Sequence, residues 1–375
     1  MKKASLIISI IIFIISCFIA YDVINRKEEI HFIPTIKEID DGVKSIKFKV
    51  DTFYLAIGES EKLNYDIESS KDDYKLTLSS ENEDIVSISD GKIVGINLGT
   101  SVVTLKSESG KKAEVSVTVT DLIRKPELDD KKKFLPCHAY TEEEAHIIDE
   151  ALRTRVLNKG EGTRAALIET IRFMTLSFKY KVSYFYENGR MHESGVRKAD
   201  GEGRYYHKGL YLSEDKFKDI KVSHKGPAIW GCPLTNLQDH NRYKPGAKMP
   251  NGLDCSGFVT WSLYNSGLDV GDIGAGINDR HKDMSDVGEM HSLTYEYANS
   301  GDYKVGDVIA RWGHTALIAG KDSEYLYIAE SLLKGVRIEK VSYKNPNSSL
   351  YKYYAYINKM DKEYSKNDDY TDMWE

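Results

Sequence analysis

The sequence predicts a multidomain chain in which an N-terminal membrane helix precedes an all-β sandwich and then an α+β domain. An unbroken apolar run near the N-terminus, short alternating segments in the next part, and helical spacing followed by a hairpin pattern after Thr141 lead to this prediction. At 375 residues the chain is long enough for two or three folded units.

The composition narrows the class of protein. Hydrophobic residues make up 41% of the chain and charged residues 29%, which is typical of a globular, soluble protein. The net charge is -6 and no block of Lys and Arg occurs, so nucleic acid is not the expected partner, because phosphate binding requires clustered cations. Four cysteines are too few and too scattered for a disulfide-built scaffold.

Residues 1–22 predict a signal-anchor or transmembrane segment. Lys2 and Lys3 precede an apolar run from Ala4 to Ala20, which as a helix would span about 25 Å, slightly less than the ~30 Å hydrocarbon core. Two alternatives remain open: Ile14 to Cys17 resembles a lipobox, in which case Cys17 is lipidated, or the segment is cleaved and the protein is secreted. All three export the chain, and the expected location is the extracellular face of a bacterial cell membrane, anchored by the N-terminal helix.

Residues 23–43 are charged and aperiodic and are expected to be a spacer. Residues 44–121 alternate apolar and polar side chains, and Asp90-Gly91 predicts a tight hairpin because both residues tolerate positive φ. This segment resembles a bacterial immunoglobulin-like domain of group 2, on the stretches LAIGESEKL, LSSENEDIVSISDGKIVGINLGTSVVTL and VSVTV. The resemblance implies a spacer or adhesion module, and we expect a spacer.

Residues 122–140 are expected to be a charged linker. After it, Thr141 and Glu144 have the spacing of a capping box, which predicts the start of a helix, and Thr163 is a candidate cap for a second helix. The apolar faces of both helices are expected to belong to the core rather than to a site.

The segment NGLDCSGFVTWSLYNSG contains the first candidate for chemistry. Cys255 follows a turn and precedes a helical run that ends near Gly267, so it is expected at a helix N-terminus. The helix dipole and free backbone N–H groups there favour a thiolate and can lower a thiol pKa to about 3.5 to 7.5. A structural cysteine gains nothing from that position, so Cys255 is the predicted nucleophile.

His314 is the predicted base. It opens the strand HTALIAG, which turns through Lys321 to Ser323 into the strand EYLYIAES. A turn centred on Asp322 would place His314 directly opposite Glu330 in the ladder. Glu330 is therefore predicted to orient the imidazole as the third catalytic residue.

The motif DCSGFV, followed 59 positions after Cys255 by His314 inside GDVIARWGHTALIAG, resembles the NlpC-type papain-like cell-wall cysteine peptidases. The resemblance implies that residues 141–360 form a papain-like thiol protease domain of α+β class, with Cys255 and His314 as the catalytic pair. The family usually places His, Asn or Gln on the next strand, so Glu330 departs from its pattern.

The same resemblance implies three substrate-binding residues: Tyr184 in the stretch SYFYENG, and Asp254 and Ser256 on either side of the nucleophile. Turn formation and helix capping are the alternative roles of Asp254 and Ser256. The region from residue 190 to residue 250 is larger than the compact family pattern needs, and residues 361–375 form a polar tail.

The resemblance implies a cell-wall hydrolase, a peptidoglycan D,L-endopeptidase-like enzyme that cleaves stem peptides, often between D-glutamate and a diamino acid. Cleavage would proceed through a thioester acyl-enzyme and would require no cofactor. Its expected partners are the stem peptides, the cell wall and, through the N-terminal helix, the membrane. Two alternatives remain: an acyltransferase or amidase acting on another surface amide, and a non-catalytic surface adhesin.

Two further cysteines, Cys137 and Cys232, lie in the third region, and a disulfide between them is possible in an exported protein. Cys137, His138 and His146 lie close in sequence, but no second ligand cluster with zinc-like spacing accompanies them, so no metal is expected.

Overall fold

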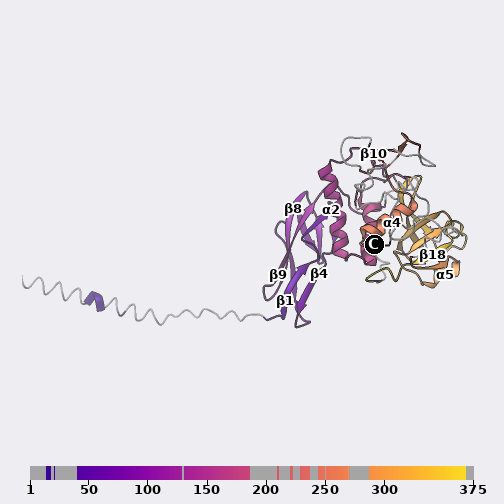
Figure 1. Ribbon diagram of the computed structural model, residues 1–375. Coiled ribbons are helices and arrows are strands. Elements are labelled where there is room, and N and C mark those ends of the chain that lie inside the picture. Colours follow the sequence, from indigo (N-terminus) through magenta and orange to yellow (C-terminus); the bar gives the residue numbers. More distant parts are fainter. Residues whose placement is uncertain are drawn as a thin grey trace, which may run out of the picture.

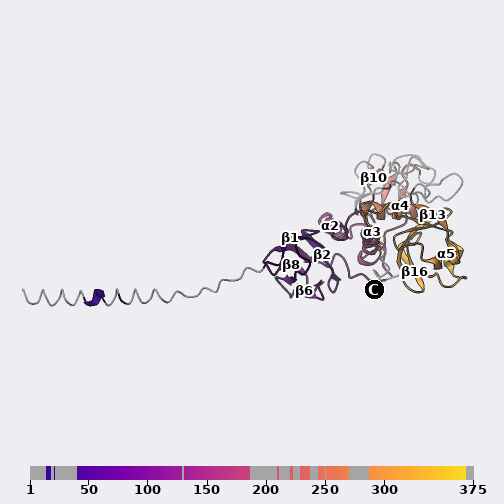
Figure 2. The same ribbon diagram turned by 90° about the horizontal axis from the view of Figure 1, so that it is seen from below.

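The computed structural model describes residues 14–17, 21, 40–128, 131–185, 209–210, 220–222, 229–236, 244–249, 251–268, 270 and 287–368. These residues form mostly β-sheet with few helices. A β-sandwich lies at one side, the long helix α2 (Glu142–Lys159) lies next to it, and a larger sheet lies beyond the helices (Figures 1 and 2).

The prediction of an N-terminal membrane helix is wrong, and the predicted fold class is corrected to a mostly β chain with few helices. Of residues 1–22, the structure describes only Ile14 to Cys17 and Tyr21, and these are helical. A helix that crosses the ~30 Å hydrocarbon core needs about 20 predominantly apolar residues. Among the helices that the structure describes, none has both the length and the apolar character to cross a membrane. The remaining residues of this segment and the predicted spacer up to residue 39 lie outside the described ranges.

The N-terminal strands pair in three groups. One sheet has the order β2-β9-β8-β5, with β2 parallel to β9 and the other neighbours antiparallel, a second has the order β3-β7-β6, and β1 pairs with β4. Alternate side chains of these strands point inward and form one apolar core, because successive residues of a strand face opposite sides. The strands are β1 (Val43–Phe48), β2 (Thr52–Leu55), β3 (Ser60–Glu61), β4 (Tyr65–Ser69), β5 (Leu76–Ser80), β6 (Val86–Ser89), β7 (Lys92–Gly95), β8 (Gly99–Ser107) and β9 (Lys112–Val119).

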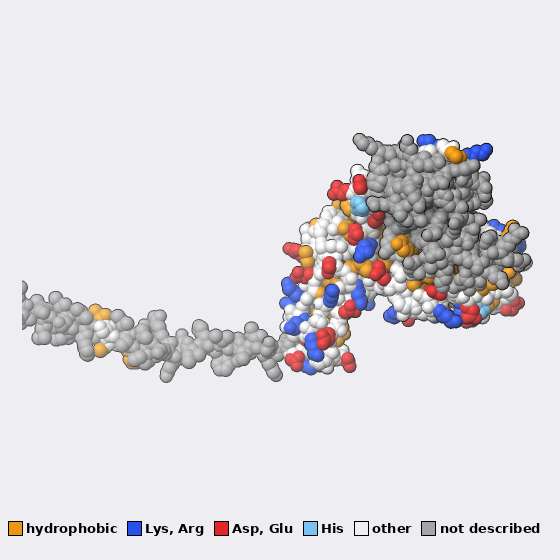
Figure 3. Space-filling model, in the orientation of Figure 1, with side chains coloured by type: hydrophobic (Ala, Val, Ile, Leu, Met, Phe, Trp, Pro, Cys, Tyr) orange, Lys and Arg blue, Asp and Glu red, His pale blue; other side chains and the backbone are white. Residues whose placement is uncertain are grey.

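The predicted hairpin at Asp90-Gly91 is confirmed. Ser89 pairs with Lys92, and the two residues between them have φ values of 49° and 71°. Both central residues of a type I′ turn require this left-handed region, which Asp tolerates and Gly adopts freely. Charged side chains of both signs are interspersed over the visible face of the sandwich (Figure 3).

The two predicted helix starts are confirmed. Thr141 caps α2 by accepting a hydrogen bond from the backbone of Glu144, whose side chain accepts one from the Thr141 N–H. Thr163 caps α3 (Arg164–Arg172) by accepting from the Ala166 N–H, and the π-helix η1 (Phe173–Ser177) continues α3. The apolar face of α2 is buried in the main core, as expected.

A six-stranded antiparallel sheet forms the C-terminal part, in the order β13-β18-β14-β15-β16-β17. Helix α4 (Cys255–Asn265) packs against β15 and β16, and β10, β11 and β12 form a separate small sheet. The remaining elements are β10 (Ile220–Val222), β11 (Leu234–Asn236), β12 (Lys248–Met249), β13 (Glu289–Ser292), α5 (Tyr295–Ser300), β14 (Val308–Arg311), β15 (His314–Lys321), β16 (Tyr325–Leu332), β17 (Gly335–Ser342), α6 (Ser349–Tyr353) and β18 (Tyr356–Lys359).

A buried ion pair joins the sandwich to α2. The Arg155 guanidinium of α2 donates to both carboxylate oxygens of Glu59, at 2.8 and 2.9 Å, and to the Tyr54 carbonyl at 2.9 Å. Nearby, Asn158 accepts from the Asn64 backbone N–H at 2.7 Å. Bidentate geometry in a closed environment fixes orientation, so the sandwich is docked on the helical layer rather than connected to it only through residues 122–140.

Candidate active site

Cys255 is the first residue of α4, so its predicted placement at a helix N-terminus is confirmed. The side chain of Asp254 caps the helix by accepting from the Gly257 N–H at 2.6 Å and from the Ser256 hydroxyl at 3.2 Å. Cys255 is only 6% exposed. The thiol therefore lies in the positive end of the helix dipole, where a thiolate is favoured over a thiol.

Two hydrogen bonds hold the loop that precedes Cys255. The Leu253 N–H donates to the Ser183 carbonyl at 3.0 Å, and the Ser331 hydroxyl of β16 donates to the Leu253 carbonyl at 2.7 Å. A Cβ at Gly252 would lie 2.0 Å from the Ser183 carbonyl oxygen, so only glycine allows this close approach. The loop before Cys255 is thus attached to the strand that carries Glu330.

His314 and Glu330 are in direct contact. Nε2 of His314 lies 2.8 Å from Oε2 of Glu330, and the two side chains are 3% and 0% exposed. Tyr354 also donates to Oε2, at 2.8 Å, while Nε and Nη2 of Arg337 donate to Oε1 at 3.0 and 2.6 Å. The carboxylate accepts four hydrogen bonds, which use its full accepting capacity.

These contacts determine the protonation of the pair. Burial raises the pKa of Glu330, but the hydrogen bonds from His314, Arg337 and Tyr354 outweigh it and hold the pKa below its ordinary value. An ionised carboxylate only accepts, so Nε2 of the imidazole carries a hydrogen and Nδ1 is the nitrogen through which the ring can exchange a proton. His314 is therefore oriented to act as a base through Nδ1.

The predicted register of this hairpin is wrong, although the predicted contact forms. Leu317 pairs with Ala329 and Ile318 with Ile328, so the same register would place Leu332, not Glu330, opposite His314. The chain turns between Asp322 and Tyr325, later than predicted. A shift of two residues keeps Glu330 on the same face of the sheet, and diagonal neighbours still reach each other.

The predicted substrate-binding residues lie close to Cys255 in the structure: Asp254 and Ser256 flank it, and Tyr184 follows a residue that contacts the loop before it. Tyr184 follows Ser183, whose carbonyl accepts from Leu253, and it is half-buried. Asp254 and Ser256 are buried and hydrogen-bonded to each other in the helix cap. Their capping role is seen directly, and their role in substrate binding stays a prediction.

Three neighbours of the site were missing from the sequence-based prediction. Arg337 is opposite Glu330 in the β16–β17 ladder, a pairing that the short turn before Gly335 would have indicated. Tyr354 follows α6 and reaches Glu330 only through tertiary packing. The Asn251 side chain is buried, and its Nδ2 has no hydrogen-bond partner among the described residues, so an N–H donor lies four residues before Cys255.

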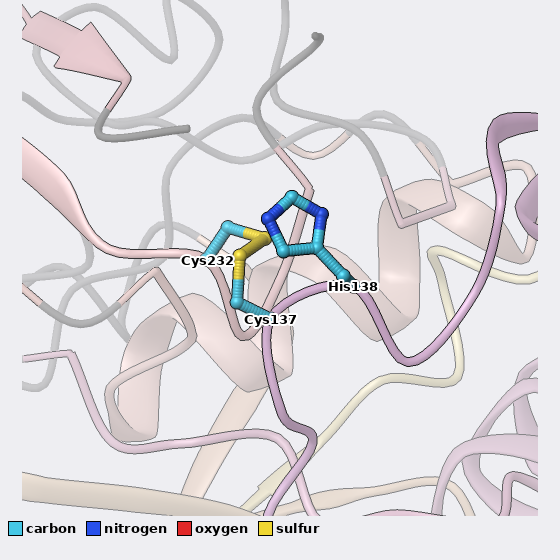
Figure 4. A group of neighbouring side chains, drawn as sticks. All are labelled: Cys137, His138 and Cys232. Atoms are coloured by element: carbon cyan, nitrogen blue, oxygen red, sulfur yellow. A yellow bond between two sulfur atoms is a disulfide. The ribbon is translucent and has the colours of Figure 1, made fainter. Parts of the chain in front are cut away.

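Cys137 and Cys232, whose pairing the sequence left open, form a disulfide (Figure 4). His138 lies beside it, and the three side chains are close enough together to share a metal ion. The two sulfurs are bonded to each other, however, which removes the thiolates that such a site would need. The disulfide holds the segment around Cys232 near the loop before Cys255, since the N–H of the adjacent Gly231 donates to the Asn251 carbonyl at 3.2 Å.

Comparison with known proteins assigns no family. No family model matches the chain, and no curated protein matches it. Similar solved structures include S-layer protein SbsC domains 4 and 5, at 18% identity and TM-score 0.19, with 21% of this chain and 46% of that chain covered. SbsC domains 4–9 match at 18% identity and TM-score 0.20, with 27% of this chain and 18% of that chain covered. SbsC domains 5–6 match at 17% identity and TM-score 0.18, with 27% of this chain and 56% of that chain covered. This chain spans less than two thirds of each of them. At these TM-scores the likeness assigns neither fold nor function.

Proposed function

We propose that this protein is a cysteine peptidase that hydrolyses an amide bond in peptidoglycan stem peptides, with Cys255 as nucleophile and His314 as base. The observation that carries the proposal is the buried His314–Glu330 pair, which leaves Nδ1 as the basic nitrogen. Cys255 begins a helix that packs on the same two strands. The arrangement supports the proposed roles of Cys255 as nucleophile, His314 as base and Glu330 as the residue that orients the base.

In the proposed reaction, Nδ1 of His314 takes the proton of the Cys255 thiol, and the resulting thiolate attacks the amide carbonyl carbon to form a tetrahedral intermediate. The imidazolium of His314 then gives its proton to the leaving nitrogen, the C–N bond breaks and a thioester remains. Water, deprotonated by His314, hydrolyses the thioester and restores the thiolate. No cofactor takes part in these steps.

Two observations support this proposal over a purely structural role for the pair. A buried carboxylate is costly unless it is fully paired, yet here the chain provides four donors to keep Glu330 ionised beside an imidazole. Second, the Cys137–Cys232 disulfide is typical of proteins that work outside the cytoplasm. We therefore place the enzyme at the bacterial cell surface, where its proposed substrate is found.

The test is digestion of purified peptidoglycan by the full-length protein, with released products identified by mass. We expect stem-peptide fragments from the parent protein and none from a Cys255→Ala variant. Transfer of the acyl group to an added amine without hydrolysis would identify an acyltransferase instead. If parent and variant both bind peptidoglycan and neither releases fragments, the proposal is rejected in favour of an adhesin.

Glu330→Gln is expected to lower kcat by about 10² to 10⁴-fold. Arg337 donates twice to Oε1 and would hold the glutamine oxygen, so that the amide NH₂ would face His314 and force the ring proton to Nδ1. Kinetic measurement on a synthetic stem peptide checks this. Glu339→Gln is the matched control, because Glu339 contacts the same arginine but not the histidine.

The Glu330→Gln variant is also expected to change how the free energy of unfolding depends on pH. The pKa of Glu330 in the folded protein is below its ordinary value, so its stabilising contribution is present above an unfolded-state pKa of about 4.3 and is lost as the pH falls through the lower folded pKa. Glu330→Gln is therefore expected to lower the free energy of unfolding at pH 7 and to approach the parent in acid. A constant difference across this pH range would contradict the assignment.

A further inference from the structure

Arg311 is a cation placed directly beside the proposed base. It is the last residue of β14 and pairs with His314 across a two-residue turn, Trp312-Gly313. Its guanidinium carbon lies 4.0 Å from the centre of the Tyr353 ring. The Tyr353 ring is in turn edge-on to His314, with 5.6 Å between ring centres. A single aromatic ring thus links the cation to the imidazole.

Arg311 has no acidic partner in the part of the chain that the structure describes. Among the described residues, its buried Nε finds no hydrogen-bond partner and its guanidinium forms no ion pair. Three other arginines, of which Arg337 is partly exposed, contact carboxylates: Arg155 contacts Glu59, Arg164 contacts Asp307 and Arg337 contacts Glu330. An unsatisfied buried N–H is unfavourable and calls for an explanation.

The guanidinium is also oriented. Stacking over Tyr353 restricts the planar group, so that less rotational freedom is lost when it binds a ligand. Carboxylate and phosphate are the common partners that fit a guanidinium best, because each can accept two parallel hydrogen bonds from it. Beside it, Trp312 is 71% exposed and offers a flat apolar surface to a bound chain.

We propose that Arg311 forms a subsite that binds a free carboxylate of the substrate next to the scissile amide, an inference that rests on the proposed peptidase function. A D-glutamate joined through its γ-carboxyl retains a free α-carboxylate a few bonds from that amide. The enzyme would therefore select acidic stem peptides and discriminate against those in which this carboxylate is amidated.

The test uses the full-length Cys255→Ala protein, so that binding is measured without hydrolysis. Two synthetic peptides carry D-glutamate joined through its γ-carboxyl to a diamino acid, one with a free α-carboxylate and one with the α-carboxamide. Calorimetry is expected to show tighter binding of the acid. Adding Arg311→Gln should weaken binding of the acid by about 10 to 100-fold and leave the amide unchanged, because only a charge-assisted bond is lost.

Two further variants make the result specific. Arg311→Lys should recover part of the preference, since it retains the charge but not the fork. Lys340→Gln is the matched control. Lys340 lies on β17, and its cation stacks over the ring of Tyr325. This variant should change the affinity for neither peptide. Urea unfolding of each variant checks that the fold is retained.

Equal weakening of both peptides by Arg311→Gln, or no binding of the acid by the Cys255→Ala protein, would overturn the subsite. Failure of the subsite and failure of the peptidase function are distinguishable. Acid-selective binding without hydrolysis by the parent protein would reject the peptidase and keep the subsite, whereas hydrolysis of both peptides at equal kcat/KM would do the reverse.

Discussion

Replacing either Cys255 or His314 by alanine is expected to lower kcat for stem-peptide hydrolysis by as much as about 10⁶-fold, and the double replacement is expected to cost no more than either alone. Without the imidazole, no group takes the thiol proton and delivers it to the leaving amine. Without the thiol, the imidazole forms no acyl-enzyme. The two residues act as a unit, so their effects do not add. Steady-state kinetics on a synthetic stem peptide measure all three variants.

His291→Ala is the control for this prediction. His291 is another histidine with a glutamate neighbour, 3.2 Å from Glu289, and its ring stacks on Tyr297 at 5.1 Å between centres. It lies on β13, at the edge of the sheet, and its removal should leave kcat unchanged. Losses that multiply in the Cys255 and His314 double variant would show that the two residues act independently, contrary to the proposed mechanism.

Arg155→Met is expected to lower the free energy of unfolding by about 3 to 5 kcal/mol. The side chains of Arg155 and Glu59 are 1% and 2% exposed, and the variant would leave the Glu59 carboxylate buried without its cation. Glu169, 3.6 Å from the same guanidinium, would lose a partner as well. Urea denaturation of the full-length protein, followed by circular dichroism, measures the change.

The matched control for the interface is Lys112→Met. Lys112 contacts Glu114 at 2.6 Å on the sandwich surface, with both side chains about half exposed or more, and an exposed pair of this kind contributes at most about 1 kcal/mol. If the sandwich were a loose spacer, Arg155→Met would be as mild as this control. A large difference between the two variants would show that the sandwich is part of the stability of the whole.

Short-range patterns in the sequence predicted the local structure well. The capping box of Thr141, the cap of Thr163 and the Asp90-Gly91 turn formed as predicted, because each depends on residues within four positions of one another. Cys255 begins a helix for the same reason, because the cap that starts this helix is formed by the adjacent Asp254 and Gly257. The predicted membrane span is the exception, because no helix among the described residues has both the length and the apolar character to cross a membrane.

The contacts of the site were decided by tertiary structure. His314 meets Glu330 diagonally rather than directly, because the position of the turn sets the register and a two-residue shift retains the face. Tyr354 and the Cys137–Cys232 disulfide join segments that no local pattern relates. The sequence by itself determined which residue types were available for chemistry and which local elements carry them. Only the tertiary structure decided that the pKa of Glu330 is lowered, that Nε2 of His314 faces this carboxylate and that Arg311 has no acidic partner among the described residues. Hydrogen bonding and burial depend on residues distant in the chain.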